Sequence, residues 1–192
     1  MHVFVTGGSG QTGPAVVAEL IAAGHTVSAL ARSDAAAARL KSLGGTSHRG
    51  SLDDLDSLRS GAEAADAVLH MAYGGDFSDL DEMMRRDRTA IEAFGRPLEH
   101  SGKPLVVTSG TLVMPAGRES AENDEPDTAG IAAFRIAGER AGLDFATRGV
   151  RASVVRLAPT VHGPEDHGFI PMLIGTARKT GVSAYMEDGT NR

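Results

Sequence analysis

The stretch VTGGSGQTG, residues 5–13, joins two segments with different hydrophobic patterns. HVFVTG (2–7) is predicted to be a short buried strand, and PAVVAELIAAG (14–24) a helix that ends on Gly24. Glycines at such a junction let the backbone turn tightly and approach a pyrophosphate, whose charge the helix N-terminus favours. The order of strand, glycines and helix therefore predicts a dinucleotide-binding turn.

Two glycine patterns overlap in this turn. Gly8, Gly10 and Gly13 fit G-x-G-x-x-G, whereas Gly7, Gly10 and Gly13 fit G-x-x-G-x-x-G. The sequence leaves both patterns open, and a turn that only connects a strand to a helix is the alternative to either. A Walker-type phosphate loop is disfavoured, because no Gly-Lys-Ser/Thr follows the glycines.

The rest of the chain repeats the alternation of strand and helix. Further strands are predicted at 26–32, 46–51, 67–72, 104–110, 152–158 and 182–186, and further helices at 34–43, 54–61, 79–101, 129–148 and 168–180, with a loop over 111–128. Apolar strands that alternate with helices indicate a parallel sheet covered on both faces. Right-handed crossovers then give an α/β fold, a doubly wound Rossmann-type sheet. We expect one NAD(P)-binding domain over 1–192, in which 160–192 begin a substrate-binding part.

Composition limits the classes of partner. A net charge of −6 provides no basic surface for nucleic acid or anionic lipid. The absence of cysteine excludes disulfides and thiolate metal sites, and it suits a reducing cytosol. We expect no signal peptide, since the first residues run directly into an apolar segment, and no membrane span, since no apolar run is long enough. We therefore expect a cytoplasmic protein that acts on a small-molecule substrate. The sequence leaves open whether the protein forms a homodimer.

The end of the second predicted strand bears on the choice of cofactor. An NAD site usually presents a carboxylate there to the ribose 2′-hydroxyl, but this chain has Ala31 followed by Arg32 and Ser33. A guanidinium suits a dianionic 2′-phosphate, so the sequence predicts NADP. Asp34 could still serve NAD if the turn is offset, and a solvated Arg32 is the structural alternative.

Six segments together carry a family resemblance: TGGSGQTG, LARSD, GSLDDLDSL, HMAYGG, VVTSGT and RLAPTVHGP, in this order. The chain resembles the extended and atypical short-chain dehydrogenases/reductases, specifically the NAD(P)-dependent epimerase/dehydratase group, over almost its whole length. The resemblance implies cofactor contacts from Gly7, Ser9, Gly10, Gln11, Thr12 and Gly13 at the pyrophosphate, Arg32 and Ser33 at the adenosine 2′ position, Ser51 and Leu52 at the adenine, Met71, Ala72 and Tyr73 at the ribose and nicotinamide, and Pro159, Thr160 and Val161 at the carboxamide.

The catalytic signature of that family is not present. Its tyrosine, four residues before a lysine, corresponds in IAAFRIAGE to Ile131, and its lysine corresponds to Arg135. An arginine can bind ribose hydroxyls but cannot give up its proton, and a solvated helix arginine is the alternative. Ser109 and Thr111 are the candidate catalytic hydroxyls, and the alternative for both is a role in capping the loop.

The histidines and the chain length add further expectations. His70 is expected to be a core histidine, whereas His162 and His167 are candidates for the missing acid. No ligand spacing predicts a metal site. Members of the family usually continue further, so either the chain is a truncated form or the substrate lid is largely absent.

These features predict an NADP-dependent oxidoreductase that transfers a hydride between NADP(H) and a small carbonyl or alcohol. A sensor or regulatory protein that binds NADP without turnover is the first alternative, since the family tyrosine is missing. A nucleotide-sugar epimerase or dehydratase is the second, although that chemistry needs the tyrosine even more.

Overall fold

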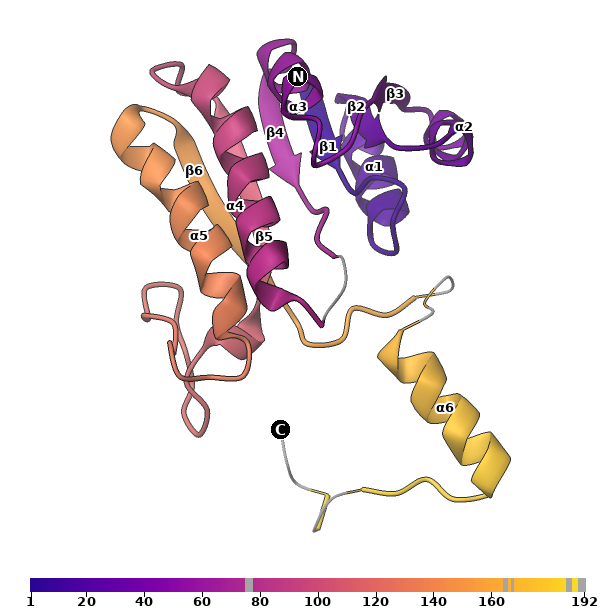
Figure 1. The fold of residues 1–192 in the computed structure, drawn as a ribbon. Helices are drawn as coiled ribbons and strands as arrows, with labels where there is room; N and C mark the ends of the chain where they lie inside the picture. The colour runs from indigo at the N-terminus through magenta and orange to yellow at the C-terminus, as the bar shows by residue number, and fades with distance from the viewer. Residues whose placement is uncertain (75–77, 164–165, 167, 186–187, 190–192) are drawn as a thin grey trace. The chain divides into compact units, whose positions relative to one another are not determined.

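The computed structural model describes residues 1–74, 78–163, 166, 168–185 and 188–189 (Figure 1). The chain divides into two compact units, Met1–Pro159 and Thr160–Arg192. The boundary coincides with the predicted start of a substrate-binding part at 160, and the role of the second unit stays a prediction. No helix among the described residues combines the length and the apolar character that crossing a membrane would need.

A six-stranded parallel sheet lies at the centre of the first unit, in the order β3-β2-β1-β4-β5-β6. Its strands are β1 His2–Thr6, β2 Thr26–Ala31, β3 Thr46–Arg49, β4 Ala67–His70, β5 Pro104–Gly110 and β6 Arg151–Leu157. The chain builds outward from β1 to β3 and then returns to place β4 on the other side of β1. This order confirms the predicted Rossmann-type fold and puts its switch point between β1 and β4, where such sheets bind ligands.

The helices lie between successive strands in the sequence. In the first unit they are α1 Gly13–Ala22, α2 Asp34–Ser42, α3 Leu55–Glu63, α4 Leu80–Gly95 and α5 Ile136–Leu143. The second unit contains α6 Phe169–Thr180, which follows β6 in the sequence. The 3₁₀ turns are η1 Arg96–Leu98, η2 Thr111–Val113, η3 Ala133–Arg135 and η4 Asp144–Arg148. The side chains of Ser33, Asp54 and Asp79 cap the N-termini of α2, α3 and α4 by accepting backbone N–H groups. Such caps satisfy donors that a helix start leaves unpaired.

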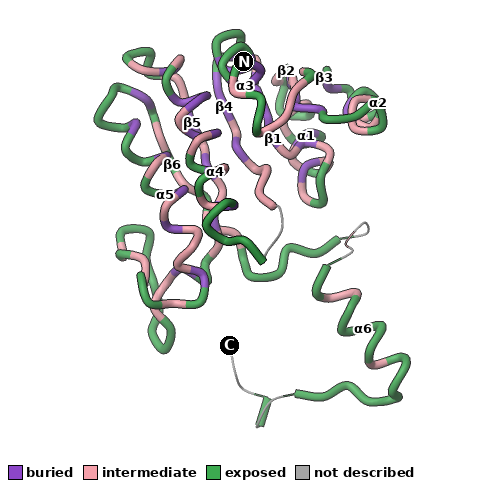
Figure 2. Tube along the Cα trace, in the orientation of Figure 1, coloured by how far each residue is buried: buried purple, intermediate pink, exposed green. Residues whose placement is uncertain are grey.

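Both faces of the sheet are buried, and the side chains of β1 contribute to a core cluster on each face. Val3 and Val5 join a core cluster with Val17 of α1 and Leu40 of α2. Phe4, between them in sequence, joins a second cluster with residues of α3, α4, β5 and η4. Because side chains alternate along a strand, one apolar run serves both clusters. Figure 2 shows this burial along the strands.

Three predicted elements differ from the structure by more than a few residues at their ends. The helix expected over 129–148 begins helical turns only at Ala133, and it divides into η3, α5 and η4. The helix expected over 79–101 ends at Gly95 and gives way to η1, because Pro97 lacks the N–H that an α-helix would need there. The strand expected at 182–186 is wrong for its described residues 182–185, which are exposed and pair with no strand, while residue 186 lies outside the described residues.

Candidate functional site

Gly7 and Gly13 let the backbone pack closely in the turn after β1. Gly7 has a φ of +78°, and a Cβ there would lie 2.8 Å from the backbone nitrogen of Ala72. A Cβ on Gly13 would overlap the carbonyl oxygen of Gly7. Gly7 thus lets the turn lie against the segment that follows β4, and Gly13 lets α1 begin directly beneath the turn.

Gly8 and Gly10 of this turn face different surroundings. A Cβ on Gly8 would lie 2.9 Å from the side chain of Ala29, within the core. A Cβ on Gly10 would meet only the Gly7 carbonyl oxygen, at 3.2 Å. The space beside Gly10 is therefore open to a ligand. Gly7, Gly8 and Gly13 are closely packed and Gly10 borders open space, so the structure is compatible with both glycine patterns.

A pocket of about 530 Å³ lies in the first unit, where the segments after β1, β2 and β4 meet. Its size is typical of small-molecule sites. The predicted cofactor residues that line it are Gly7, Ser9, Gly10, Gln11, Thr12, Arg32, Ser33, Leu52, Met71, Ala72 and Tyr73. Residues far apart in sequence thus converge at the switch point of the sheet.

Several predicted residues lie elsewhere. Gly13, Ser51, Ser109, Thr111, Arg135 and Pro159 are in the first unit but do not line the pocket, and Thr160 and Val161 belong to the second unit. The Ser51 hydroxyl accepts the backbone N–H of Asp53 at 3.2 Å, so it serves its own turn. Thr111 is exposed at the start of η2.

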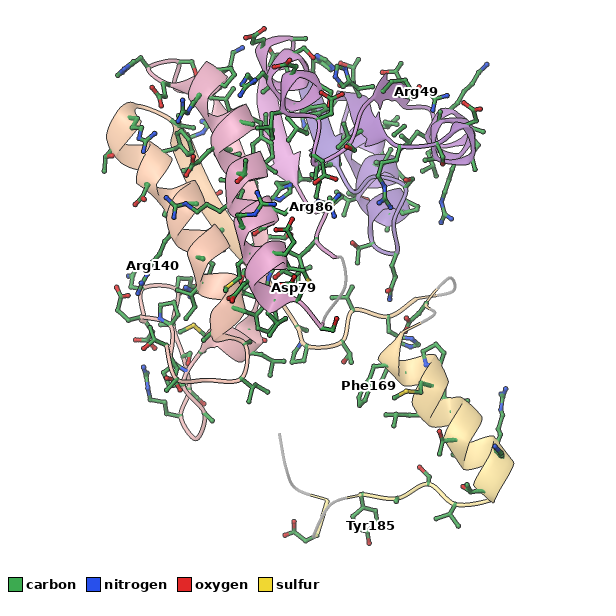
Figure 3. All side chains as sticks on the ribbon, viewed as in Figure 1. Arg49, Asp79, Arg86, Arg140, Phe169 and Tyr185 are labelled. Carbon is green, nitrogen blue, oxygen red and sulfur yellow. The ribbon has the colours of Figure 1, made fainter. Side chains whose placement is uncertain are left out.

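Four residues line the pocket that the sequence did not predict: Leu30, Ala36, Gly74 and Arg86. Arg86, labelled on α4 in Figure 3, forms an ion pair with Asp53 at 2.6 Å, and its buried Nε has no hydrogen-bond partner among the described residues. Its neighbours Arg85 and Arg88 pair within α4, with Glu82 and Glu92. Nothing in the local sequence distinguishes Arg86 from these arginines.

The residues after β2 present one cation to the pocket. Arg32 lines the pocket and forms no ion pair with any residue that the structure describes. The Ser33 hydroxyl accepts the N–H of Ala36 at 3.2 Å and caps α2. Asp34 is exposed, lies outside the pocket lining and forms an ion pair with Arg49. The only charged side chain that residues 32–34 add to the lining is therefore a guanidinium.

A buried polar network holds the segment after β4. His70 is a core histidine, as predicted: its Nδ1 lies 2.6 Å from the Thr6 hydroxyl, and its Nε2 lies 3.0 Å from Asp87. An ionised carboxylate only accepts hydrogen bonds, so Nε2 donates to Asp87 and Nδ1 accepts the Thr6 hydroxyl proton. That hydroxyl oxygen also accepts the N–H of Ala72 at 3.2 Å. The network thus fixes the backbone just before Tyr73.

Arg135 lies against Tyr73. Its Cζ is 3.3 Å from the centroid of the tyrosine ring, and its Nη2 donates to the Thr108 carbonyl oxygen at 2.6 Å. The structure therefore does not leave Arg135 as a solvated helix residue. Burial raises the pKa of the Tyr73 hydroxyl, and the nearby positive charge of Arg135 opposes that rise.

Comparison with known proteins identifies the family. The model of the NAD dependent epimerase/dehydratase family matches residues 3–192. The chain belongs to this family. An uncharacterized protein of Schizosaccharomyces pombe is 44% identical over 195 residues, covering all of this chain and 64% of the relative. A Stigmatella aurantiaca protein, 4-hydroxy-2-methyl-3-oxo-4-farnesyl-3,4-dihydroquinoline-1-oxide ketoreductase, is 30% identical over 186 residues, covering 93% of this chain and 55% of the relative.

A solved structure is also similar to this chain. MoeE5 in complex with UDP-glucose and NAD has a TM-score of 0.67 and 26% sequence identity, over 91% of this chain and 60% of that one. The chain of 192 residues therefore spans less than two thirds of the length of each of these three proteins.

Three candidates for the proton donor remain, Ser109, His162 and His167, and Ile131 occupies the position of the family tyrosine. Ile131, at the position of the family tyrosine, is 86% exposed. His162 is exposed in the second unit, where its Nδ1 lies 3.5 Å from an oxygen of Asp166. His167 lies outside the described residues. Ser109 is buried on β5, and its hydroxyl has no hydrogen-bond partner within the described part of the chain.

Proposed function

We propose that this chain holds NADP(H) and acts as an oxidoreductase on a small carbonyl or alcohol. The single observation that carries the proposal is the pocket, which joins the glycine turn to the segment after β4 and has Arg32 in its wall. The fit is physical: the open space beside Gly10 suits a pyrophosphate, and α1 begins at the same turn. When bound, the cofactor supplies a hydride, and the protein positions the substrate and moves the proton.

The preference for NADP over NAD follows from the charges after β2. Arg32 provides a guanidinium with no other ion-pair partner among the described residues, which a 2′-phosphate would satisfy. The nearest carboxylate along the chain, Asp34, is already paired with Arg49 outside the pocket lining. A 2′-hydroxyl would therefore gain no carboxylate acceptor from residues 32–34.

Arg32→Ala should weaken NADPH binding by about 1.5–3 kcal/mol, the scale of a charge-assisted hydrogen bond, and leave NADH binding nearly unchanged. Calorimetric titration with both cofactors measures the two losses. Arg59→Ala is the control, since it removes an exposed arginine of α3 that does not line the pocket and leaves the pairing of Asp34 intact. Equal weakening of both cofactors by Arg32→Ala would contradict the assignment to the 2′ position.

Ser109→Ala should lower kcat by about 10²-fold or less and leave the NADPH Kd unchanged, because a hydroxyl can relay a proton but is a weak donor alone. The buried hydroxyl without a partner supports this role. Ser153→Ala, an exposed serine on neighbouring β6, serves as the control. An unchanged kcat for Ser109→Ala would make that serine a structural residue of β5.

Binding without turnover is the second candidate function, and the exposed Ile131 in place of the family tyrosine favours it. A screen of small aldehydes and ketones that follows NADPH absorbance, beside calorimetric binding, separates the two. NADPH oxidation supports the oxidoreductase, and binding with no turnover supports the sensor. UDP-sugars belong in the same screen, because their conversion without net NADPH oxidation would indicate an epimerase or dehydratase.

A further inference from the structure

Tyr73, Ser109 and Arg135 each carry one buried polar side-chain atom without a hydrogen-bond partner among the described residues. These atoms are the Tyr73 hydroxyl oxygen, the Ser109 hydroxyl oxygen and Arg135 Nη1. Arg135 contacts the ring of Tyr73 and donates to the carbonyl of Thr108, the residue before Ser109. Buried polar groups are rarely left unpaired in folded proteins, so the Tyr73 hydroxyl and Arg135 Nη1, which belong to two residues in contact, point to a polar ligand.

Tyr73 is the member of this group that also belongs to the pocket wall. Its backbone position is fixed by the hydrogen bond from Ala72 to Thr6, and Phe134 stacks near its ring at a centroid distance of 6.4 Å. The guanidinium of Arg135 covers the ring at 3.3 Å. The ring is therefore held between the segment after β4 and η3, beside the proposed cofactor site.

We propose that Tyr73, supported by Arg135, is the proton donor to the substrate oxygen and replaces the family tyrosine, whose position Ile131 occupies after the loop that follows β5. This inference rests on the proposed oxidoreductase function. The proton donor would then come from a different element than in the family, since Tyr73 lies in the segment after β4. The cation beside it, Arg135, occupies the position of the family lysine. Tyr73 is then a catalytic residue, and Arg135 is its positioning and charge-stabilising partner.

The proton transfer balances with the hydride that the proposed cofactor supplies. The carbonyl carbon receives the hydride, and the carbonyl oxygen receives the proton of the Tyr73 hydroxyl. The C=O π bond is lost while one C–H and one O–H bond form, and the resulting phenolate regains a proton from water. Arg135 cannot donate a proton, but its charge stabilises the phenolate at close range.

Two charged groups act on the Tyr73 hydroxyl. Burial raises its pKa above the ordinary value of 10.0, Arg135 on η3 lowers it, and Asp87 on α4 adds to the rise. The hydroxyl is therefore protonated at neutral pH, the state that an acid for carbonyl reduction requires. Loss of the Arg135 charge should raise the pKa further.

The first test needs no cofactor. The chain has two tyrosines and no tryptophan, so Tyr185→Phe leaves Tyr73 as its only phenol. Ultraviolet absorbance of tyrosinate then titrates Tyr73 alone. We expect a pKa above 10.0 that rises further in Tyr185→Phe/Arg135→Gln. A pKa that is unmoved by Arg135→Gln would overturn the coupling of the two residues.

The second test measures turnover of small aldehydes and ketones with saturating NADPH. Tyr73→Phe should lower kcat by about 10²–10⁴-fold, the contribution of a positioned acid, and change the NADPH Kd by less than about twofold. Tyr185→Phe, which changes an exposed tyrosine of the second unit, is the reference background, and Tyr185→Phe/Tyr73→Phe should show the same loss relative to it. In the Tyr185→Phe protein, kcat should fall as the pH rises through the pKa of Tyr73. Adding Arg135→Gln should shift this pH profile of kcat and the absorbance titration of Tyr73 together.

The outcomes separate this inference from the function on which it rests. A wild-type protein that turns over, with a Tyr73→Phe variant of equal rate, overturns the inference and leaves the oxidoreductase intact. A wild-type protein that binds NADPH but reduces no carbonyl removes the oxidoreductase and the inference with it. A rate loss in Tyr73→Phe that comes entirely from weaker NADPH binding assigns Tyr73 to the cofactor site and overturns its role as the acid.

Discussion

Gly10→Val should abolish dinucleotide binding and leave the protein folded. Gly10 does not have a positive φ, and its added Cβ would meet only one backbone oxygen, at 3.2 Å. The valine side chain would instead occupy the open space beside the turn, where the pyrophosphate should lie. We expect NADPH affinity to fall by at least about 100-fold, or about 2.7 kcal/mol, by calorimetry.

Gly13→Val provides the contrast within the same turn. A Cβ on Gly13 would overlap the Gly7 carbonyl oxygen, so this variant should lose thermal stability as well as binding. Circular dichroism and thermal unfolding distinguish the two variants. A Gly10→Val protein with its native spectrum and wild-type NADPH affinity would rule out the turn as the pyrophosphate site.

Glu139→Ala should destabilise the protein strongly. The Glu139 carboxylate is 2% exposed and accepts hydrogen bonds from Arg156 at 2.7, 3.0 and 3.2 Å, which ties α5 to β6. Removing one partner of such a pair leaves an unpaired charge in a largely buried place. We expect a loss of about 3 kcal/mol in the free energy of unfolding, at the lower end for a broken buried pair because Arg156 keeps some exposure.

The loss corresponds to a fall in Tm of about 6–12 °C for a chain of this size, measured by thermal unfolding. Glu99→Ala is the matched control, because its pair with Arg148 at 3.2 Å is more exposed and should contribute less than about 1 kcal/mol. Glu139→Leu with Arg156→Met should recover much of the stability by removing both charges. Equal losses in Glu139→Ala and Glu99→Ala would show that burial of the first pair adds nothing.

The amino-acid sequence determined the class of fold and the part of the site that is contiguous in the chain. The alternation of apolar strands and helices predicted the parallel sheet, because each pattern depends on residues close in sequence. Gly7, Gly10 and Gly13 could be recognised for the same reason: strand, turn and helix follow one another directly. The expected strand at 182–186 failed over its described residues, since an apolar run carries no information on whether a neighbouring strand is present.

Only the tertiary structure decided which polar side chains act together. Gly8 and Gly10 look equivalent in sequence, yet one faces the core and the other faces open space. Arg86 resembles its neighbours on α4 but lines the pocket, and Tyr73 meets Arg135 only because β4 and β5 are adjacent in the sheet. These contacts join residues that are distant along the chain, and they depend on the order of strands and the facing of helices, which no local pattern encodes.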